Sequence, residues 1–91
     1  PQKKGRQSRL RALAAEERTM VFYESPHRVV KALQQMQEVF GPERPVAVCR
    51  EISKVHEEVV RGALSEVLTH FETHEPRGEF VLVVGGREAS L

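Results

Sequence analysis

The chain of 91 residues contains no tryptophan, no aspartate and a single cysteine, Cys49. All thirteen acidic residues are therefore glutamates, which excludes the usual EF-hand and aspartate-based magnesium patterns. One cysteine cannot form a disulfide within the chain. Its place in an apolar run predicts a small buried side chain in a reducing compartment, consistent with a cytoplasmic protein. No apolar run approaches the length of a membrane span, and no signal-peptide pattern is present.

The composition is that of an ordinary soluble domain, with 30% charged and 40% hydrophobic residues. The length allows one small domain. The net charge of +1 is unevenly distributed, because the first fifteen residues hold five cations and no acid. Such a basic arm is suited to follow a nucleic-acid backbone, although a solvated basic helix face has the same composition.

Hydrophobic spacing predicts alternating helices and strands. We expect a helix over residues 6–17, a strand over 19–23, a helix over 26–40, and strands over 45–50 and 80–84. In the helix over 26–40, apolar residues recur at the spacing of one core-facing stripe: Val29, Leu33, Met36 and Phe40. Ser25 is a favourable N-cap, Pro26 a favourable first helical residue, and Gly41 with Pro42 a stop.

Residues 55–73 fit two structures equally well. One is a single long helix, in which Gly62 would cost about 1 kcal/mol. The other is a short strand over 57–61 followed by a helix over 64–73. The second option gives the order αβαββαβ and an α/β domain with a mixed four-stranded sheet. The strand over 80–84 is apolar throughout, so we expect it in the centre, with 57–61 on an edge beside 46–50.

The segment from Phe22 to Arg28 is the first candidate site. It carries a buried-type strand directly into a helix start, yet Arg28 lies at the positive end of the helix dipole, where a cation gains nothing. Free backbone N–H groups, Ser25 and Arg28 together would suit an anion. An exposed ion pair of Arg28 with Glu24 or Glu51 explains the same residues without a ligand.

The second candidate site runs from Arg50 to Glu58, in a presumed loop after the second strand. It offers cations, an imidazole and carboxylates within nine residues, and loops at strand ends often carry function. His56 or Glu57 is suited to general acid–base chemistry. A charged hairpin loop has the same composition.

Two further patterns carry weaker predictions. His70 and His74 are spaced to share a helix face, but two ligands without an HExxH pattern do not define a zinc site. Phe22 and Tyr23 are suited to stack on bases. RNA-recognition modules also need aromatic residues on a second central strand, so we expect both rings in the core.

Several strings, in this order, resemble one family: Phe22–Arg28, Arg50–Glu58, Arg61–Gly62 and Gly78–Val84. They are similar to the C-terminal domain of the small-subunit ribosomal RNA methyltransferases I, within the tetrapyrrole-methylase-like family. The resemblance implies transfer of a methyl group from S-adenosylmethionine to the ribose 2′-OH of a cytidine. It also implies two α/β domains with the cofactor between them, and a homodimer.

The resemblance further implies that residues 1–91 are the C-terminal domain of a longer enzyme and are inactive alone, because the glycine-rich N-terminal half is absent. It favours the strand-plus-helix structure for residues 57–73. One departure is Ala63, where the family commonly has threonine; the missing cap hydroxyl would cost about 1 kcal/mol.

The site that the resemblance implies lies at the cleft between the two domains. Ser25, His27 and Arg28 would face this cleft, and Lys54, His56 and Glu57 would approach it from the adjacent loop. Arg28 and Lys54 would hold RNA phosphate or the cofactor carboxylate, and Glu57 or Glu24 would orient them. The remaining expected contacts are Arg50 at the cleft and the basic arm on RNA: Lys3, Lys4, Arg6 and Arg9.

Three other functions fit the same residues. The chain could be a stand-alone RNA-binding module, a dimerisation domain without ligand contacts, or part of a tetrapyrrole methylase that acts on corrin or porphyrin precursors.

Overall fold

The structure is a computed structural model that describes the backbone of residues 8–51 and 57–90. A helical segment over residues 8–12 comes first. The remaining elements are, in chain order, β1 (Met20–Glu24), α2 (Val29–Phe40), β2 (Pro45–Glu51), β3 (Glu57–Ala63), α3 (Leu64–Thr73) and β4 (Glu79–Val84). None of the helices in this part of the chain is both long enough and apolar enough to cross a bilayer.

The four strands form one sheet in the order β1-β4-β2-β3. The predicted central place of β4 and edge place of β3, paired with β2, are confirmed. The prediction of a mixed sheet is wrong, because all three pairings are antiparallel. β1 and β2 are each antiparallel to β4 and so point the same way, but β4 lies between them. No parallel pair therefore forms.

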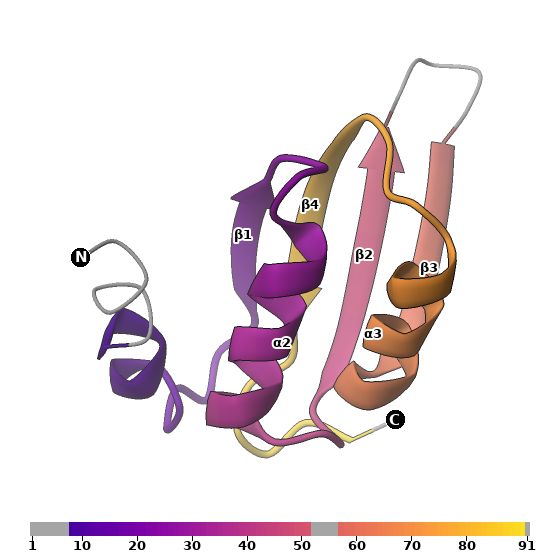
Figure 1. The fold of residues 1–91 in the computed structure, drawn as a ribbon. Helices are drawn as coiled ribbons and strands as arrows, with labels where there is room; N and C mark the ends of the chain where they lie inside the picture. The colour runs from indigo at the N-terminus through magenta and orange to yellow at the C-terminus, as the bar shows by residue number, and fades with distance from the viewer. Residues whose placement is uncertain (1–7, 52–56, 91) are drawn as a thin grey trace.

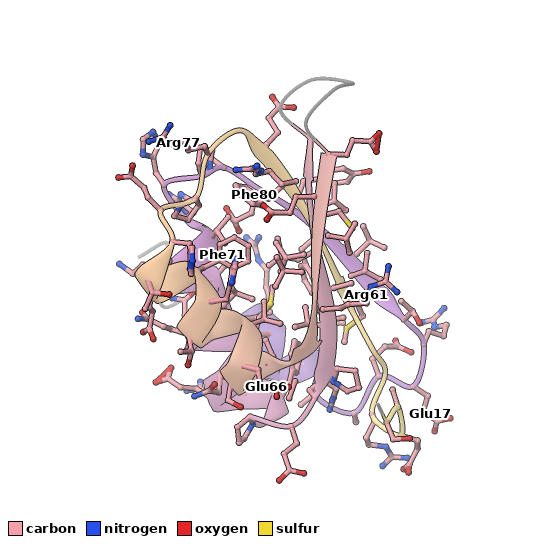
Figure 2. All side chains as sticks on the ribbon, turned by 90° about the vertical axis from the view of Figure 1, so that its right-hand side faces the viewer. Glu17, Arg61, Glu66, Phe71, Arg77 and Phe80 are labelled. Carbon is pink, nitrogen blue, oxygen red and sulfur yellow. The ribbon has the colours of Figure 1, made fainter. Side chains whose placement is uncertain are left out.

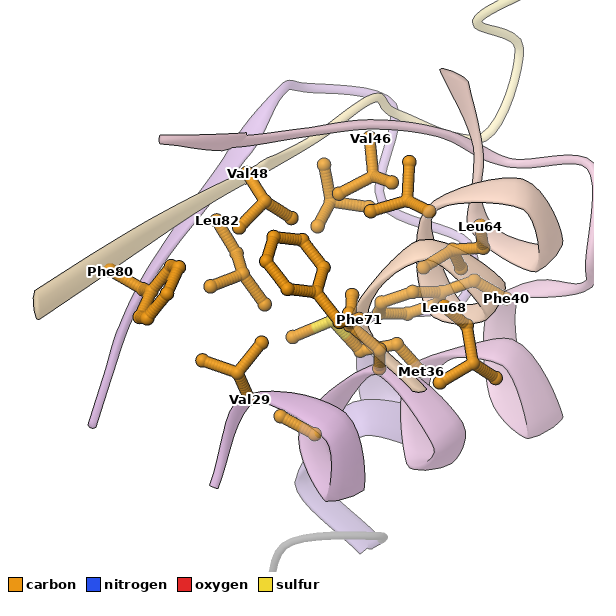
Figure 3. Packing of buried hydrophobic residues seen from close by; sticks show 14 of the residues in the cluster. Val29, Met36, Phe40, Val46, Val48, Leu64, Leu68, Phe71, Phe80 and Leu82 are labelled. Carbon is orange, nitrogen blue, oxygen red and sulfur yellow. The ribbon is translucent and has the colours of Figure 1, made fainter. Parts of the chain in front are cut away.

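Both α2 and α3 cover the same face of the sheet (Figure 1). Alternate strand residues point toward them, and Val48, Leu82 and Val84 are fully buried. The core between the layers also contains Phe71 and Phe80, whose rings meet edge to face at 5.6 Å between centroids (Figure 3). The predicted stripe of α2 is confirmed, since Val29, Leu33, Met36 and Phe40 are all buried. α2 ends at Phe40, before Gly41 with φ of 95°.

The start of α2 differs from the prediction. The helix begins at Val29 rather than at Pro26, and Ser25 does not cap it. Instead, the Ser25 carbonyl oxygen accepts a hydrogen bond from the Arg28 N–H at 3.0 Å, which closes a turn over residues 25–28. Pro26 suits the second position of such a turn as well as it suits a first helical position, so its identity did not distinguish the two.

Residues 57–73 form a strand and then a helix, as the resemblance implied. Ala63 is the N-cap of α3 and has no side-chain acceptor, but its N–H donates to Glu66 Oε1 at 2.9 Å. The next two amides also find partners, because Leu64 N–H donates to the Arg44 carbonyl and Ser65 N–H to the Pro42 carbonyl. The loop before β2 therefore accepts hydrogen bonds from two backbone amides of α3 that would stay unpaired even with a hydroxyl at the cap position.

The Arg44 side chain contacts three other segments at the end of the sheet where β2 begins. Its buried guanidinium donates to the Gly85 and Ala14 carbonyl oxygens at 3.1 and 3.3 Å and lies 5.1 Å from the centroid of the Phe40 ring. We call this region the packed end.

The segment before β1 also joins the packed end. The helical segment stops at residue 12, where the prediction extended it to 17, and residues 13–15 form turns. Beyond them, Arg87 N–H donates to the Glu16 carbonyl at 2.7 Å. A Cβ added at Gly86 would collide with the Glu17 carbonyl oxygen, so the chain after β4 passes directly against this segment. Continuation of the helix would displace the carbonyl groups that receive these contacts.

Candidate functional site

The two segments singled out in the sequence leave the sheet at the same end. β1 finishes at Glu24 and β2 at Glu51, while β3 and β4 begin there. Glu24 is paired with Phe80, which is paired with Arg50, which is paired with Glu58. Because adjacent strands are about 4.8 Å apart, the backbones at Glu24 and Arg50 are about 10 Å apart. We call this region the open end.

The turn over residues 25–28 lies beside this row. Ser25, His27 and Arg28 are all exposed, and Glu24 is half-buried. Arg28 occupies the N-cap position of α2, where no side-chain hydrogen bond caps the helix and no acidic residue lies in the first turn. Neither a capping side chain nor a carboxylate of the first turn therefore offsets the positive end of the helix dipole.

Arg50 forms an ion pair at the same end. Its Nε lies 3.4 Å from Glu58 Oε1 across the β2–β3 pair. The Arg50 side chain is only 24% exposed, whereas that of Glu58 is 43% exposed. The pairing holds the guanidinium on the helix-covered side of the sheet, in the row that contains Phe80. Sequence reasoning included Arg50 but missed Glu58 as its partner, because the pair depends on strand register.

The loop residues of the second candidate site are only partly described. Lys54 and His56 lie outside the described residues. Glu57 is exposed at the start of β3, opposite Glu51, which in turn is opposite Glu79 at the start of β4. Sequence reasoning also missed Glu79. The prediction that the last strand is central was the signal that could have placed Glu79 in this row, opposite Glu51.

The described part of the basic arm lies away from the open end. Lys3, Lys4 and Arg6 are outside the described residues, and Arg9 is exposed in the helical segment over 8–12. A shallow hollow between this segment and α2 is lined by Arg11, Ala14, Glu38 and Val39. Those α2 residues lie ten or more positions beyond Arg28, which is about 15 Å along the helix.

The structure corrects two predictions about side chains. Tyr23 is 80% exposed and lies outside the core, whereas Phe22 is partly buried and packs against the core. Cys49 is half-buried and faces away from the helices, since it shares a row with Tyr23 and Val81. Both errors have one cause: alternation along a strand assigns the faces only when the register is known.

His70, in the last turn of α3, and His74, its C-cap, form a stack. The His70 and His74 rings are nearly parallel, with centroids 4.4 Å apart, and His74 Nδ1 lies 2.9 Å from the His70 carbonyl oxygen. Over the part of the chain that the structure describes, no three residues among His, Cys, Asp and Glu are placed to hold a metal ion.

Comparison of the sequence and the structure with known proteins identifies the family of this chain. Residues 1–68 match the family model described as Tetrapyrrole (Corrin/Porphyrin) Methylases. The chain belongs to the tetrapyrrole methylase family. Among solved structures, cobalt precorrin-4 methyltransferase, a cobalamin biosynthetic enzyme, resembles this member of the family with a TM-score of 0.65. The alignment covers 84% of this chain and 32% of that enzyme at 19% identity, so the likeness concerns the fold.

Curated members of the tetrapyrrole methylase family are more similar to this chain in sequence than the cobalt precorrin-4 methyltransferase is. The chain is 44% identical over 81 residues to the ribosomal RNA small subunit methyltransferase I of Synechocystis, and 41% identical over 88 residues to that of Thermotoga maritima. The proteins of the same name from Mycobacterium tuberculosis are 48% identical over 81 residues. These alignments cover 89–97% of this chain but only 28–39% of the relatives. The chain thus corresponds to about a third of their length.

Proposed function

We propose that this chain is the C-terminal domain of an S-adenosylmethionine-dependent methyltransferase that methylates a cytidine ribose 2′-oxygen in small-subunit ribosomal RNA. In this proposal the open end of the sheet completes a cleft with an N-terminal domain of the same protein. The observation that carries the proposal is the convergence of the turn over residues 25–28 and the end of β2 on that end.

Sequence similarity favours RNA over a tetrapyrrole as substrate. The relatives at 41–48% identity are named as ribosomal RNA methyltransferases, whereas the corrin methyltransferase shares 19% identity and only the fold. The strings on which the resemblance depends also include the residues of the open end: Glu24, Ser25, His27, Arg28 and Arg50.

The described residues fit part of the cofactor. S-adenosylmethionine, when bound, supplies an electrophilic methyl group on a sulfonium and carries a carboxylate. The uncapped start of α2, with Ser25 and Arg28 exposed beside it, suits a carboxylate or an RNA phosphate.

The chain's own residues would act by binding and orienting. Methyl transfer needs the 2′-oxygen held in line with the methyl group, and positioning of this kind supplies much of the rate enhancement in enzymes. Arg28 would hold the anion, and Arg50, which is paired with Glu58, would present a second cation at the same end of the sheet. Lys54, His56 and Glu57 are proposed to complete the site from the loop.

An alanine substitution at Arg28 tests the proposal in the full-length protein. We expect Arg28→Ala to lower methylation of small-subunit RNA by at least about tenfold, the equivalent of one lost charge-assisted contact. The change in unfolding free energy should stay within about 0.5 kcal/mol, because the side chain is exposed. Methylation is measured as transfer of labelled methyl groups, and stability by urea unfolding.

Arg87→Ala is the matched control, since Arg87 is an exposed arginine at the packed end, away from the turn over residues 25–28. It should retain activity. Equal losses of stability and activity in Arg28→Ala would instead assign Arg28 a structural ion pair and would reject the proposed site.

A further inference from the structure

The histidine stack at the end of α3 is not part of the proposed site, yet it lies toward the same end of the sheet. α3 begins at the packed end, where β3 finishes, and ends ahead of β4, which starts at the open end. In Figure 2, Glu66 in the first turn of α3 lies low, near the packed end, and Phe71 lies above it, close to Phe80. His70 and His74 follow in the last turn and at the C-cap, so the stack belongs to the upper part of the helix.

Ring contacts connect this stack to the row of paired residues at the open end. The His70 ring meets the Phe71 ring edge to face, with centroids 4.9 Å apart, and the Phe71 ring meets that of Phe80 in the same way. Phe80 lies between Glu24 and Arg50 in the row. Both phenylalanines are buried, so the stack continues the aromatic part of the core out to the surface.

His74 presents a flat ring with one free face. The ring is within 9° of parallel to that of His70, with centroids 4.4 Å apart, so His70 covers one of its faces. His74 is exposed, whereas His70 is half-buried. The Nδ1–H group of His74 donates to the His70 carbonyl oxygen at 2.9 Å, which holds the ring in place. A ring that is already fixed loses little entropy when a second flat group stacks on it.

The charges near this ring disfavour a phosphate as its ligand. Glu72 and Glu75 are exposed on either side of His74 in the sequence. The next cation along the chain, Arg77, lies 3.9 Å from a carboxylate oxygen of Glu75. These carboxylates would repel a phosphate but not the uncharged face of a base. Histidine is one of the side chains on which unpaired RNA bases stack.

We propose that an unpaired base of the RNA substrate stacks on the free face of the His74 ring. This inference rests on the proposed function, because it takes RNA as the substrate, and it adds a contact to a base where Arg28 is proposed to hold an anion. Every base has such a face, so the contact contributes affinity with little preference for sequence.

Substitutions at position 74 of the full-length protein test this contact. We expect His74→Ala to raise the Kd for a fluorescently labelled single-stranded RNA of mixed sequence by at least about fivefold, the lower end of what one stacked base contributes. His74→Phe keeps an aromatic face without charge or hydrogen-bonding groups, and its Kd should stay within about threefold of the original value. His74→Lys keeps a cation without a ring and should bind as weakly as His74→Ala. Fluorescence anisotropy measures each Kd.

The salt dependence of binding provides a second measurement. A lost phosphate contact lowers the slope of log Kd against log salt concentration by about 0.7 for single strands, whereas His74→Ala should leave the slope unchanged. Gln34→Ala, at an exposed position of α2, is the neutral control and should change neither Kd nor slope. Urea unfolding should show that His74→Ala is folded, because the backbone bond from His74 N–H to the His70 carbonyl remains.

Four outcomes would overturn the inference. An unchanged Kd in His74→Ala would exclude the contact, and the proposed function would stand if the protein still methylates small-subunit RNA. Recovery by His74→Lys but not by His74→Phe would indicate a phosphate contact. A loss of affinity matched by a loss of stability would mean that the ring packs within the longer protein. A protein that neither binds nor methylates RNA would overturn the proposed function as well.

Discussion

At the packed end of the sheet, backbone and side-chain groups from four segments bond one another, whereas at the open end the described side chains of the turn over residues 25–28 reach solvent. Arg44 is buried and donates to two carbonyls, while Arg28 is exposed at an uncapped helix. The same residue type thus serves stability at one end and is proposed to bind an anion at the other. Variants should separate the two roles.

The largest expected effect is at Gly86, where the chain passes against Glu17. Gly86→Ala should lower the unfolding free energy by about 3 kcal/mol, since the added Cβ meets a backbone oxygen that has no other rotamer. Urea unfolding measures the change. Ser90→Ala, an exposed substitution in the same segment, should have no effect. An unchanged Gly86→Ala would mean that the two segments do not meet at the packed end.

Arg44 should follow in magnitude. Arg44→Met keeps an aliphatic chain near Phe40 but leaves the Ala14 and Gly85 carbonyls without this donor, at a cost of about 2 kcal/mol. Arg77→Met, at an exposed arginine, should stay within about 0.5 kcal/mol. Thermal unfolding of the two variants side by side gives the difference. Similar values for both would remove the distinction between buried and exposed arginines.

A smaller effect, with the opposite sign, is expected at the start of α3. Ala63→Ser restores a cap hydroxyl and should raise the unfolding free energy by about 0.5–1 kcal/mol. Ala12→Ser, at an exposed helical position, should not stabilise. An unchanged or lower stability in Ala63→Ser would indicate that this helix start gains nothing from a cap hydroxyl.

The smallest effect concerns Glu16. Hydrogen bonds from Arg18, with side chain and backbone both donating, lower the pKa of Glu16 to about 2. A depressed pKa stabilises the fold above the ordinary value of 4.5, and this contribution is lost as the pH falls toward 2. In Arg18→Gln the pKa should rise toward 4.5, as measured by NMR titration of the Glu16 carboxyl carbon. An unshifted pKa would exclude the Arg18 side chain as the main cause of the low value.

The layers of the fold were predictable from local patterns, because periodicity identified the buried stripe of α2 and apolar content identified β4 as central. The start of α2 was not, since Ser25 and Pro26 favour a turn as much as a helix. Strand direction and the exposure of Tyr23 depend on pairings between distant segments. The convergence of the two candidate sites also depends on register, which no single segment encodes.

The valines of this sheet occur on both faces, as in the run Val81-Leu82-Val83-Val84, so a shift of β4 by one residue would still place valines toward the helices, although Phe80 and Leu82 would leave the core. Such a shift would turn the core side chains outward and move Arg50 out of its row. Such a shift would also break two hydrogen bonds, one from Gly85 N–H to the Pro45 carbonyl oxygen and one from the Arg44 guanidinium to the Gly85 carbonyl oxygen. The hydrogen bonds at the packed end thus help to fix the alignment of the polar groups at the open end.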